Sequence, residues 1–158
     1  MALSHAQILD QQTAQLLANA PTDFAAKFAV QAIAPVLKTI ALELRHTHYY
    51  IIQNQKNGSW ALSNLSHRQM PELAKNVVYA YSDRTDANTI RLKQMPQDTV
   101  CQGVDLIFLL FQLVSMKEVD SLILFEQPTN TNQGTEIVRA EIEQLWQTQV
   151  QKMRQHLA

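Results

Sequence analysis

The sequence predicts a single α+β domain that spans residues 1–158. Three observations lead to this fold class: helical periodicity at both ends of the chain, alternating β-forming residues between positions 46 and 81, and one nearly continuous apolar stretch at 104–116. Hydrophobic residues make up 46% of the chain and charged residues 17%, which is typical of a globular protein with a buried core. We expect N-terminal helices, a small mixed sheet, a buried central helix and a long amphipathic helix at the C-terminus.

Two helices are predicted at the N-terminus. Ser4 can cap the first, whose apolar residues form only a narrow stripe beside many glutamines. Pro21 and Asp23 separate it from a second helix with apolar residues at helical spacing. Pro35 lies inside this second pattern and lacks a backbone donor, so we expect a kink or two short helices that meet near Ala34.

A β-hairpin is predicted next. Segments 46–53 and 58–65 are rich in β-forming residues, and Asn57-Gly58 between them is typical of a two-residue type I′ turn, which would pair Ile52 with Ser63. One face of this hairpin would carry Tyr49, Ile51, Trp60 and Leu62, and the other would carry Tyr50, Ile52, Ala61 and Leu65. Because both faces are apolar, the sheet needs cover on both sides or offers an apolar surface to a partner.

Two further strands complete the predicted sheet. Segment 66–75 is interpreted as a polar connection with a helical turn from Pro71, and 76–81 as a strand with Tyr79 and Tyr81 on one face and Val78 on the other. A loop at 82–86 is followed at 89–93 by a short strand or a turn. Segment 121–125 is a short apolar run, typical of an interior strand.

The central helix is predicted from the apolar stretch at 104–116. Asp98 and Thr99 would cap it after Pro96, and Cys101 would pack near its start. At about 13 residues it is shorter than the ~20 needed to cross a bilayer, so we expect it in the protein core. A strand, a helix and the strand at 121–125 would form a parallel crossover.

The last helix is predicted to start near 134–136, after a polar loop at 127–133, and to run almost to the end of the chain. Its apolar residues recur at three- and four-residue intervals. This face would pack on the core, and a homodimer built on residues 135–157 is an alternative use of it.

Composition narrows the range of functions. A net charge of -1 argues against nucleic acid and anionic membranes as general partners. With three glycines, the chain has no glycine-rich phosphate loop. One cysteine and the absence of a signal-peptide pattern favour a reducing, cytoplasmic location. We expect no cofactor and no structural metal.

No catalytic signature is present, so the chain is predicted not to be an enzyme. His46 and His48 are two apart on a predicted strand and would share a face, but no third metal ligand has matching spacing. Cys101 is interpreted as a packed small hydrophobe and not as a nucleophile.

The acidic residues are interpreted as structural. Asp83 and Asp86, with Arg84 between them, would cap and hold a loop. Asp105 interrupts the apolar stretch, and two interpretations are open for it. We favour a solvated edge of the helix over the alternative, an ion pair with a base such as Arg91 or Lys93.

Aromatic side chains on the strands are the best candidates for a binding site, since tyrosine and tryptophan anchor many protein interfaces. The predicted partner-binding residues are Tyr49, Trp60, Leu62, Tyr79 and Tyr81. RNA stacking on such a sheet is less favoured, because segments 46–53, 58–65 and 76–81 contain no lysine or arginine.

Three segments, 58–62, 75–81 and 104–126, give the chain a layout that resembles the CcmS family, small cyanobacterial proteins that assist β-carboxysome assembly. The resemblance implies a non-enzymatic assembly factor that grips the C-terminal tail of a hexameric carboxysome shell protein. It transfers no binding residue, so the aromatic site rests on the residues alone. The alternatives are a small-molecule-binding regulatory domain, with a pocket between the central helix and the sheet, and an enzyme that uses Asp105 or His48.

Overall fold

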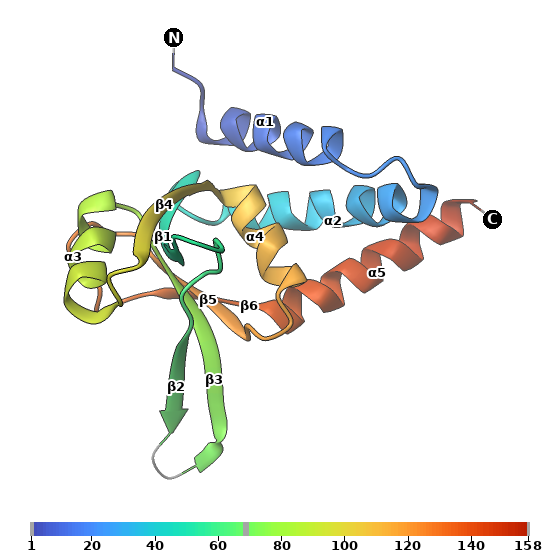
Figure 1. The fold of residues 1–158 in the computed structure, drawn as a ribbon. Helices are drawn as coiled ribbons and strands as arrows, with labels where there is room; N and C mark the ends of the chain where they lie inside the picture. Colours follow the sequence, from blue (N-terminus) through green and yellow to red (C-terminus); the bar gives the residue numbers. More distant parts are fainter. Residues whose placement is uncertain (1, 68–69, 158) are drawn as a thin grey trace.

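A six-stranded mixed sheet with helices on both faces organises the chain in a computed structural model that describes residues 2–67 and 70–157 (Figure 1). The α+β class predicted from the sequence is confirmed. In chain order the elements are α1 (His5–Ala18), α2 (Phe24–Leu42), β1 (His48–Asn54), β2 (Ser63–His67), β3 (Met70–Tyr81), α3 (Arg84–Gln94), β4 (Thr99–Asp105), α4 (Leu106–Ser115), β5 (Ser121–Phe125), β6 (Thr135–Val138) and α5 (Arg139–Leu157).

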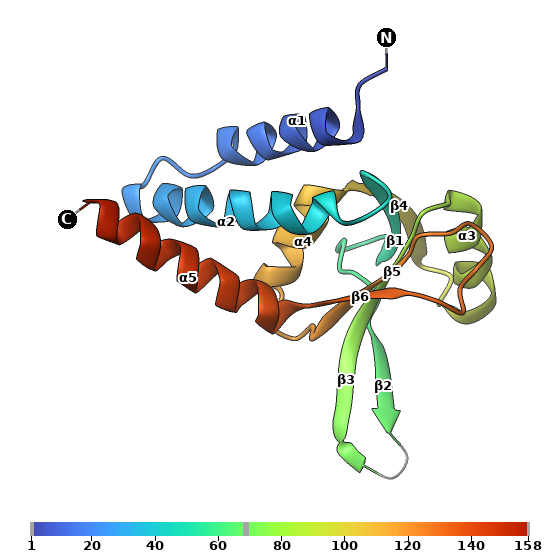
Figure 2. The same cartoon turned by 180° about the vertical axis from the view of Figure 1, so that it is seen from behind.

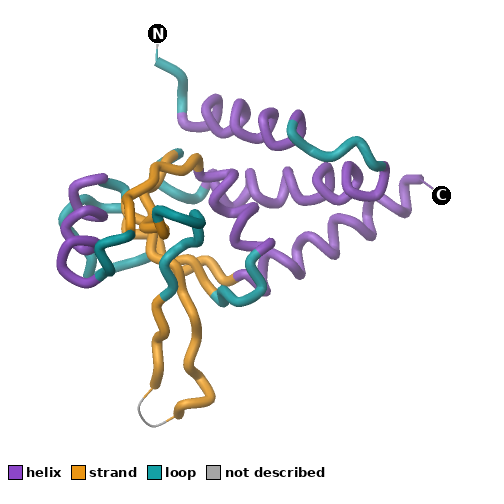
Figure 3. The backbone as a smooth tube through the Cα atoms, in the orientation of Figure 1, coloured by secondary structure: helices purple, strands orange, loops and turns teal. Residues whose placement is uncertain are grey.

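The strands lie in the order β4-β1-β3-β5-β6, and β2 pairs with β3. β1 runs antiparallel to β3 and β4, whereas β5 runs parallel to β3 and antiparallel to β6. β4 and β5 are therefore parallel and joined through α4, with β1 and β3 between them; the predicted parallel crossover into 121–125 is present, but its first strand, β4, was not predicted. β2 and the first half of β3 project from the sheet as a two-stranded ribbon (Figure 3).

Helices α1, α2, α4 and α5 lie on one side of the sheet, and α3 covers the other (Figure 2). On the side of the four helices, Tyr49 and Ile51 of β1 and Val78 of β3 join the main core. On the side of α3, Ile52 and Tyr81 belong to a smaller core. The alternation predicted for these strands is confirmed, and so is the need for cover on both faces.

The N-terminal helices begin where the sequence predicts. Ser4 forms a capping box with Gln7, and Asp23 caps α2. The prediction of two short helices at Pro35 is wrong, because α2 is one helix from Phe24 to Leu42. Pro35 and Gln31, four residues before it, are both exposed, so the carbonyl that loses its hydrogen bond lies on the solvent side.

Among the described residues, α2 alone is long and apolar enough to cross a membrane by length and composition. Its buried residues, however, pack in the protein interior. They are Val30, Ala32, Ile33, Ala34, Leu37 and Ala41. α5 packs along α2, where the Trp146 indole donates to the carbonyl of Ala29 at 3.0 Å. The homodimer proposed for α5 stays a prediction.

The central helix starts later than predicted. Residues 99–105 form β4, which pairs with β1 from His48↔Asp105 to Asn54↔Thr99, and α4 begins at Leu106. Residues 99–105 pair with β1 over their whole length, and this ladder satisfies the backbone groups of β4 that face β1. Cys101 accordingly lies on a strand, half-buried beneath α3.

The predicted hairpin also differs. Gly58 has a φ of +72°, but Asn57 does not share the positive φ that a type I′ turn requires. The chain reverses over a longer turn, in which the Asn54 side chain accepts from the amides of Lys56 (2.9 Å) and Asn57 (3.2 Å). A single bridge, Gln53↔Trp60, replaces the predicted ladder, and Ser63 pairs with Val77 of β3.

Three other segments depart from the prediction. The described part of 66–75 is strand and not a polar connection with a helical turn, while residues 68–69 lie outside the described chain. Residues 84–94 form α3, with Asp83 as its cap, and not a loop followed by a strand or turn. β6 precedes the last helix, so α5 begins at Arg139.

Candidate functional site

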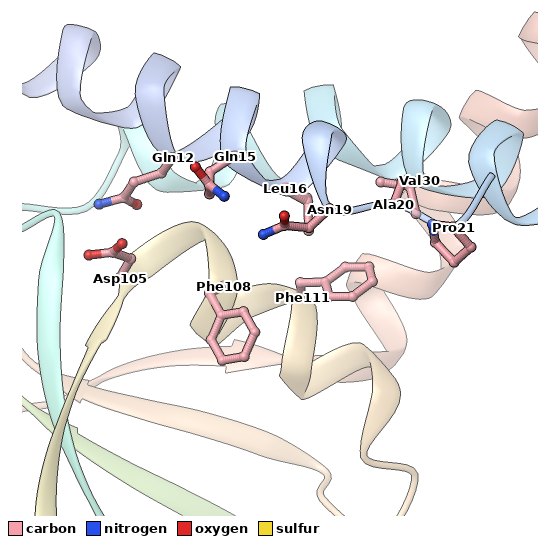
Figure 4. Close-up of a pocket in the computed structure, with 10 residues that line it drawn as sticks. All are labelled: Gln12, Gln15, Leu16, Asn19, Ala20, Pro21, Val30, Asp105, Phe108 and Phe111. Carbon is pink, nitrogen blue, oxygen red and sulfur yellow. The ribbon is translucent and has the colours of Figure 1, made fainter.

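An apolar hollow of about 250 Å³ lies between α1 and α4 (Figure 4). Its apolar lining comes from Leu16, Ala20, Pro21, Val30, Phe108 and Phe111. Carboxamide and carboxylate groups line the rest: Gln12, Gln15, Asn19 and Asp105. The hollow therefore combines an apolar interior with polar groups that can hydrogen-bond to a bound backbone or side chain.

One α1 side chain fixes the position of α1 over α4. The amide nitrogen of Gln12 donates to the carbonyl of Thr47 at 2.8 Å, and its side-chain oxygen accepts from the amide of Ile107 at 3.1 Å. The second bond satisfies a free amide in the first turn of α4. Asp105 is the N-cap residue of α4 but makes no side-chain cap bond, so its carboxylate faces outward for other contacts.

Phe108 is an exposed apolar residue of α4, a helix whose apolar residues are otherwise buried or half-buried. It is 49% exposed, whereas its neighbours Ile107 and Leu109 are completely buried. A second, shallower hollow of about 230 Å³ lies on its other side and shares both Asp105 and Phe108 with the first. The remaining lining residues of this second hollow are Gln53, Trp60, Gln102, Gly103 and Val104. We call the two hollows together the α1–α4 cleft.

Among the described residues, Asp105 is the only formally charged one that lines the α1–α4 cleft. Its side chain is 62% exposed, so the predicted exposure to solvent is correct, but Asp105 ends β4 and precedes α4 instead of lying on an edge of the helix. Its partner is an imidazole: the carboxylate lies 3.2 Å from Nδ1 of His48. Arg91, one of the bases considered from the sequence, instead donates to Asn88 and to the carbonyl of Thr99. A single carboxylate beside the apolar lining of the cleft favours a cationic group on the bound molecule.

β4 borders the cleft and is the last strand of the sheet; within the described residues, no strand lies beyond it. Hydrogen bonds from Leu106 to Thr47 and from Gln55 to Asp98 fix the phase of its ladder with β1. The alternation of an antiparallel ladder then directs the peptide groups of Cys101 and Gly103 away from β1, toward the open edge. This edge can accept another strand.

The five predicted partner-binding residues do not form one surface. Tyr49 (0% exposed) and Tyr81 (3% exposed) are interior residues on opposite faces of the sheet. Tyr79 stacks on Phe125 on the α3 side, with ring centroids 5.5 Å apart. Leu62 is exposed outside the cleft, and Trp60 alone of the five lines it.

Burial also shifts the pKa of these tyrosines further from neutral pH. Desolvation raises the pKa of Tyr81 to about 12. The pKa of Tyr49 is raised further, first by burial and then by Glu126, which accepts a hydrogen bond from its hydroxyl at 3.1 Å. Both side chains stay protonated and act as packing groups.

The residues considered for metal binding and catalysis are dispersed. Nε2 of His46 lies 2.6 Å from the carbonyl of Glu126, while His48 pairs with Asp105, so the two histidines do not share a face as predicted. The reason is that β1 begins only at His48, so strand alternation does not extend to His46. The described residues contain no group of three His, Cys, Asp or Glu side chains that could hold a metal ion.

The Cys101 side chain lacks the lowered pKa of an activated nucleophile. Burial raises the pKa of its thiol, against the opposing influence of Arg84 and Arg91. Asp83 and Asp86 are structural, as interpreted from the sequence, but they act on a helix and not within a loop: Asp83 caps α3 by accepting from the amide of Thr85 (2.9 Å), and Asp86 in the first turn of α3 accepts from the amide of Thr129 (2.7 Å).

Sequence reasoning missed most of the cleft. Phe108 is indistinguishable from its buried neighbours in an apolar run, and Gln12, Gln15 and Asn19 look like ordinary surface residues of a weakly amphipathic helix. Asp105, the one charge in the apolar run, and Trp60, one of the predicted partner-binding residues, are the lining residues that the sequence singled out. No protein-family model matches the chain, and the comparison with curated proteins finds no similar protein.

Proposed function

We propose that the protein is a non-enzymatic adaptor that holds a short segment of another protein in the α1–α4 cleft. The observation that supports this most is the position of Phe108. A phenylalanine left half exposed between two hollows, beside an open strand edge, forms an apolar contact point with room for side chains on either side.

The size of the hollows favours a peptide over a metabolite. Small-molecule sites usually enclose roughly 300–1,000 Å³. The two hollows of about 250 and 230 Å³ are smaller and lie on either side of Phe108, so each suits one or two anchoring side chains of a peptide.

A small-molecule-binding regulatory domain is the second candidate. The apolar walls and polar rim of the larger hollow favour it. The predicted pocket between the central helix and the sheet corresponds in place only to the second hollow, since the larger one lies between α4 and α1. A bound metabolite detected by native mass spectrometry of the purified protein would support this candidate over the adaptor.

The resemblance to the CcmS family suggests which partner to test first. We propose the C-terminal tail of a hexameric carboxysome shell protein, bound in the cytoplasm without a cofactor. A flexible tail loses conformational entropy when it binds, so micromolar affinity is expected, which suits an assembly factor that must release its partner.

Co-purification tests this proposal. Tagged protein should retain a cyanobacterial hexameric shell protein and lose it when the C-terminal tail of the shell protein is deleted. Phe108→Ala should reduce retention strongly, because burying a phenylalanine contributes ~1.5–3 kcal/mol. Leu92→Ala is the matched control, since Leu92 is 73% exposed on α3, outside the cleft. Equal retention by both variants would contradict the proposal.

A further inference from the structure

We propose that the bound segment lies extended along the outer edge of β4 as an added strand, and that it places a lysine or arginine against Asp105 beside an apolar side chain on Phe108. This inference rests on the proposed function and specifies the chemistry of its partner. It is supported by the composition of β4, by the direction of its peptide groups and by the charge of the cleft.

β4 lacks the features that usually protect an edge strand. Such strands are commonly short, or carry lysine, proline or a bulge. β6, at the opposite end of the sheet, has four residues and holds Glu136 in an ion pair with Lys75. β4 has seven residues, reads Thr-Val-Cys-Gln-Gly-Val-Asp, and is uncharged until Asp105.

The open part of this edge runs from Cys101 to Asp105. At the start of β4, before the open part, Thr99 is buried and its carbonyl accepts a hydrogen bond from Arg91 at 3.2 Å. Farther along, Gln102 and Asp105 are exposed, and Gly103 has no side chain beside the edge. The outward N–H groups of Cys101 and Gly103 and the outward carbonyl of Cys101 are therefore placed to bind the backbone of an extended peptide.

Charge complementarity selects the class of peptide. Asp105 lies where β4 meets α4, next to Phe108 in both hollows, and no lysine or arginine in the described part of the chain lines either hollow. A cationic side chain on the added strand would find a carboxylate beside an apolar surface. An acidic segment would meet the same carboxylate with repulsion.

Random ten-residue peptides displayed on phage, selected against the full-length protein, test this inference without assuming the partner. We expect enriched peptides to combine leucine, isoleucine, valine or phenylalanine with at least one lysine or arginine. Replacing that basic residue with glutamine should weaken binding roughly fivefold. Asp105→Asn should abolish this preference, and Glu141→Gln, which alters an exposed carboxylate on α5, should keep it.

Amide hydrogen exchange of the protein with an enriched peptide tests the strand geometry. The amides of Cys101 and Gly103 should become protected on binding, while those of Gln102 and Val104, which already face β1, should change little. Cys101→Pro removes an outward donor and should weaken binding at least tenfold, whereas Cys101→Val keeps that donor and should bind as wild type does.

The outcomes separate this inference from the proposed function. Suppose that binding depends on Phe108, but that the peptides show no preference for a basic residue and do not protect the amides of Cys101 and Gly103. This result would overturn the added strand and would still support the adaptor function. Peptides unaffected by Phe108→Ala, or no enrichment at all, would overturn both. Protection of the two amides in the free protein that increases with its concentration would assign the edge to a second copy of the chain and overturn the inference.

Discussion

The side chain of Gln12 bridges α1 to the first turn of α4, where its oxygen accepts a hydrogen bond from the amide of Ile107 at 3.1 Å. The same side chain donates to Thr47, immediately before β1. One residue of a weakly amphipathic helix thus sets the separation of the two walls of the larger hollow. The cleft depends on this polar connection as well as on apolar packing.

Gln12→Ala should destabilise the protein by about 1–2 kcal/mol, because both hydrogen bonds are lost and the Ile107 amide loses its side-chain partner. Urea denaturation measures the change. Gln11→Ala, at the exposed neighbouring position, should have little effect. Equal stability of the two variants would show that Gln12 does not hold α1 in place.

Gly103→Ala should disturb the pair formed by His48 and Asp105. A Cβ at position 103 would lie 2.5 Å from Nε2 of His48, so the imidazole must rotate away from the carboxylate. We expect a cost of about 1 kcal/mol, since a partly exposed side chain can move. In a His48→Ala background the cost should largely disappear, and a double-mutant cycle by thermal denaturation would measure this coupling.

Stability should fall at high pH because of Tyr81. Its pKa is about 12 in the folded protein, owing first to burial and then to Tyr79 and Asp86, against an ordinary value of 10.0. The unfolded chain therefore loses this proton first, so the stabilisation is complete below pH ~10 and is lost as the pH rises through 12.

The expected loss from Tyr81 is on the order of 2 kcal/mol. Tyr81→Phe should show a shallower decline when unfolding is measured between pH 9 and 12. Tyr49, whose pKa is also raised, should account for part of the decline that remains. A wild-type curve parallel to that of Tyr81→Phe would contradict this assignment.

Pro35→Ala should stabilise α2 by about 1 kcal/mol or more. The substitution restores a backbone donor in the middle of an intact helix at an exposed position, where proline is the least favourable residue. The gain is smaller than the full helix-propensity difference, because proline also restricts the unfolded chain. Circular dichroism melting measures it, and Gln31→Ala on the same exposed side is the control.

The two faces of strands such as β1 were predictable from the sequence, whereas the pairing of the strands and the boundaries of the elements were not. Alternation placed Tyr49 and Tyr50 on opposite faces of β1, as the structure confirms. β4 was not predicted as a strand, because its residues continue directly into the apolar run of α4. Its strand conformation depends on pairing with β1, which is distant in the sequence. α3 buries only Ala87 and so lacks the apolar periodicity from which helices are recognised.

The candidate site was less predictable, because it depends on what lies above α4. Phe108 lies on a side of α4 that is left partly uncovered, whereas Leu109 and Leu110 point into the main core. Placing α1 requires the bonds of Gln12, which no local pattern indicates. The aromatic residues selected from the sequence are mostly core, because a sheet covered on both faces uses large side chains for packing.

The central claim is that the α1–α4 cleft holds a segment of another protein. The most direct test is a fluorescence-anisotropy titration of a labelled peptide with the sequence of a shell-protein C-terminal tail. We predict micromolar binding to the wild type and to Leu92→Ala, and at least tenfold weaker binding to a folded Phe108→Ala variant. The same affinity for all three proteins would contradict the claim, and so would no binding to any of them.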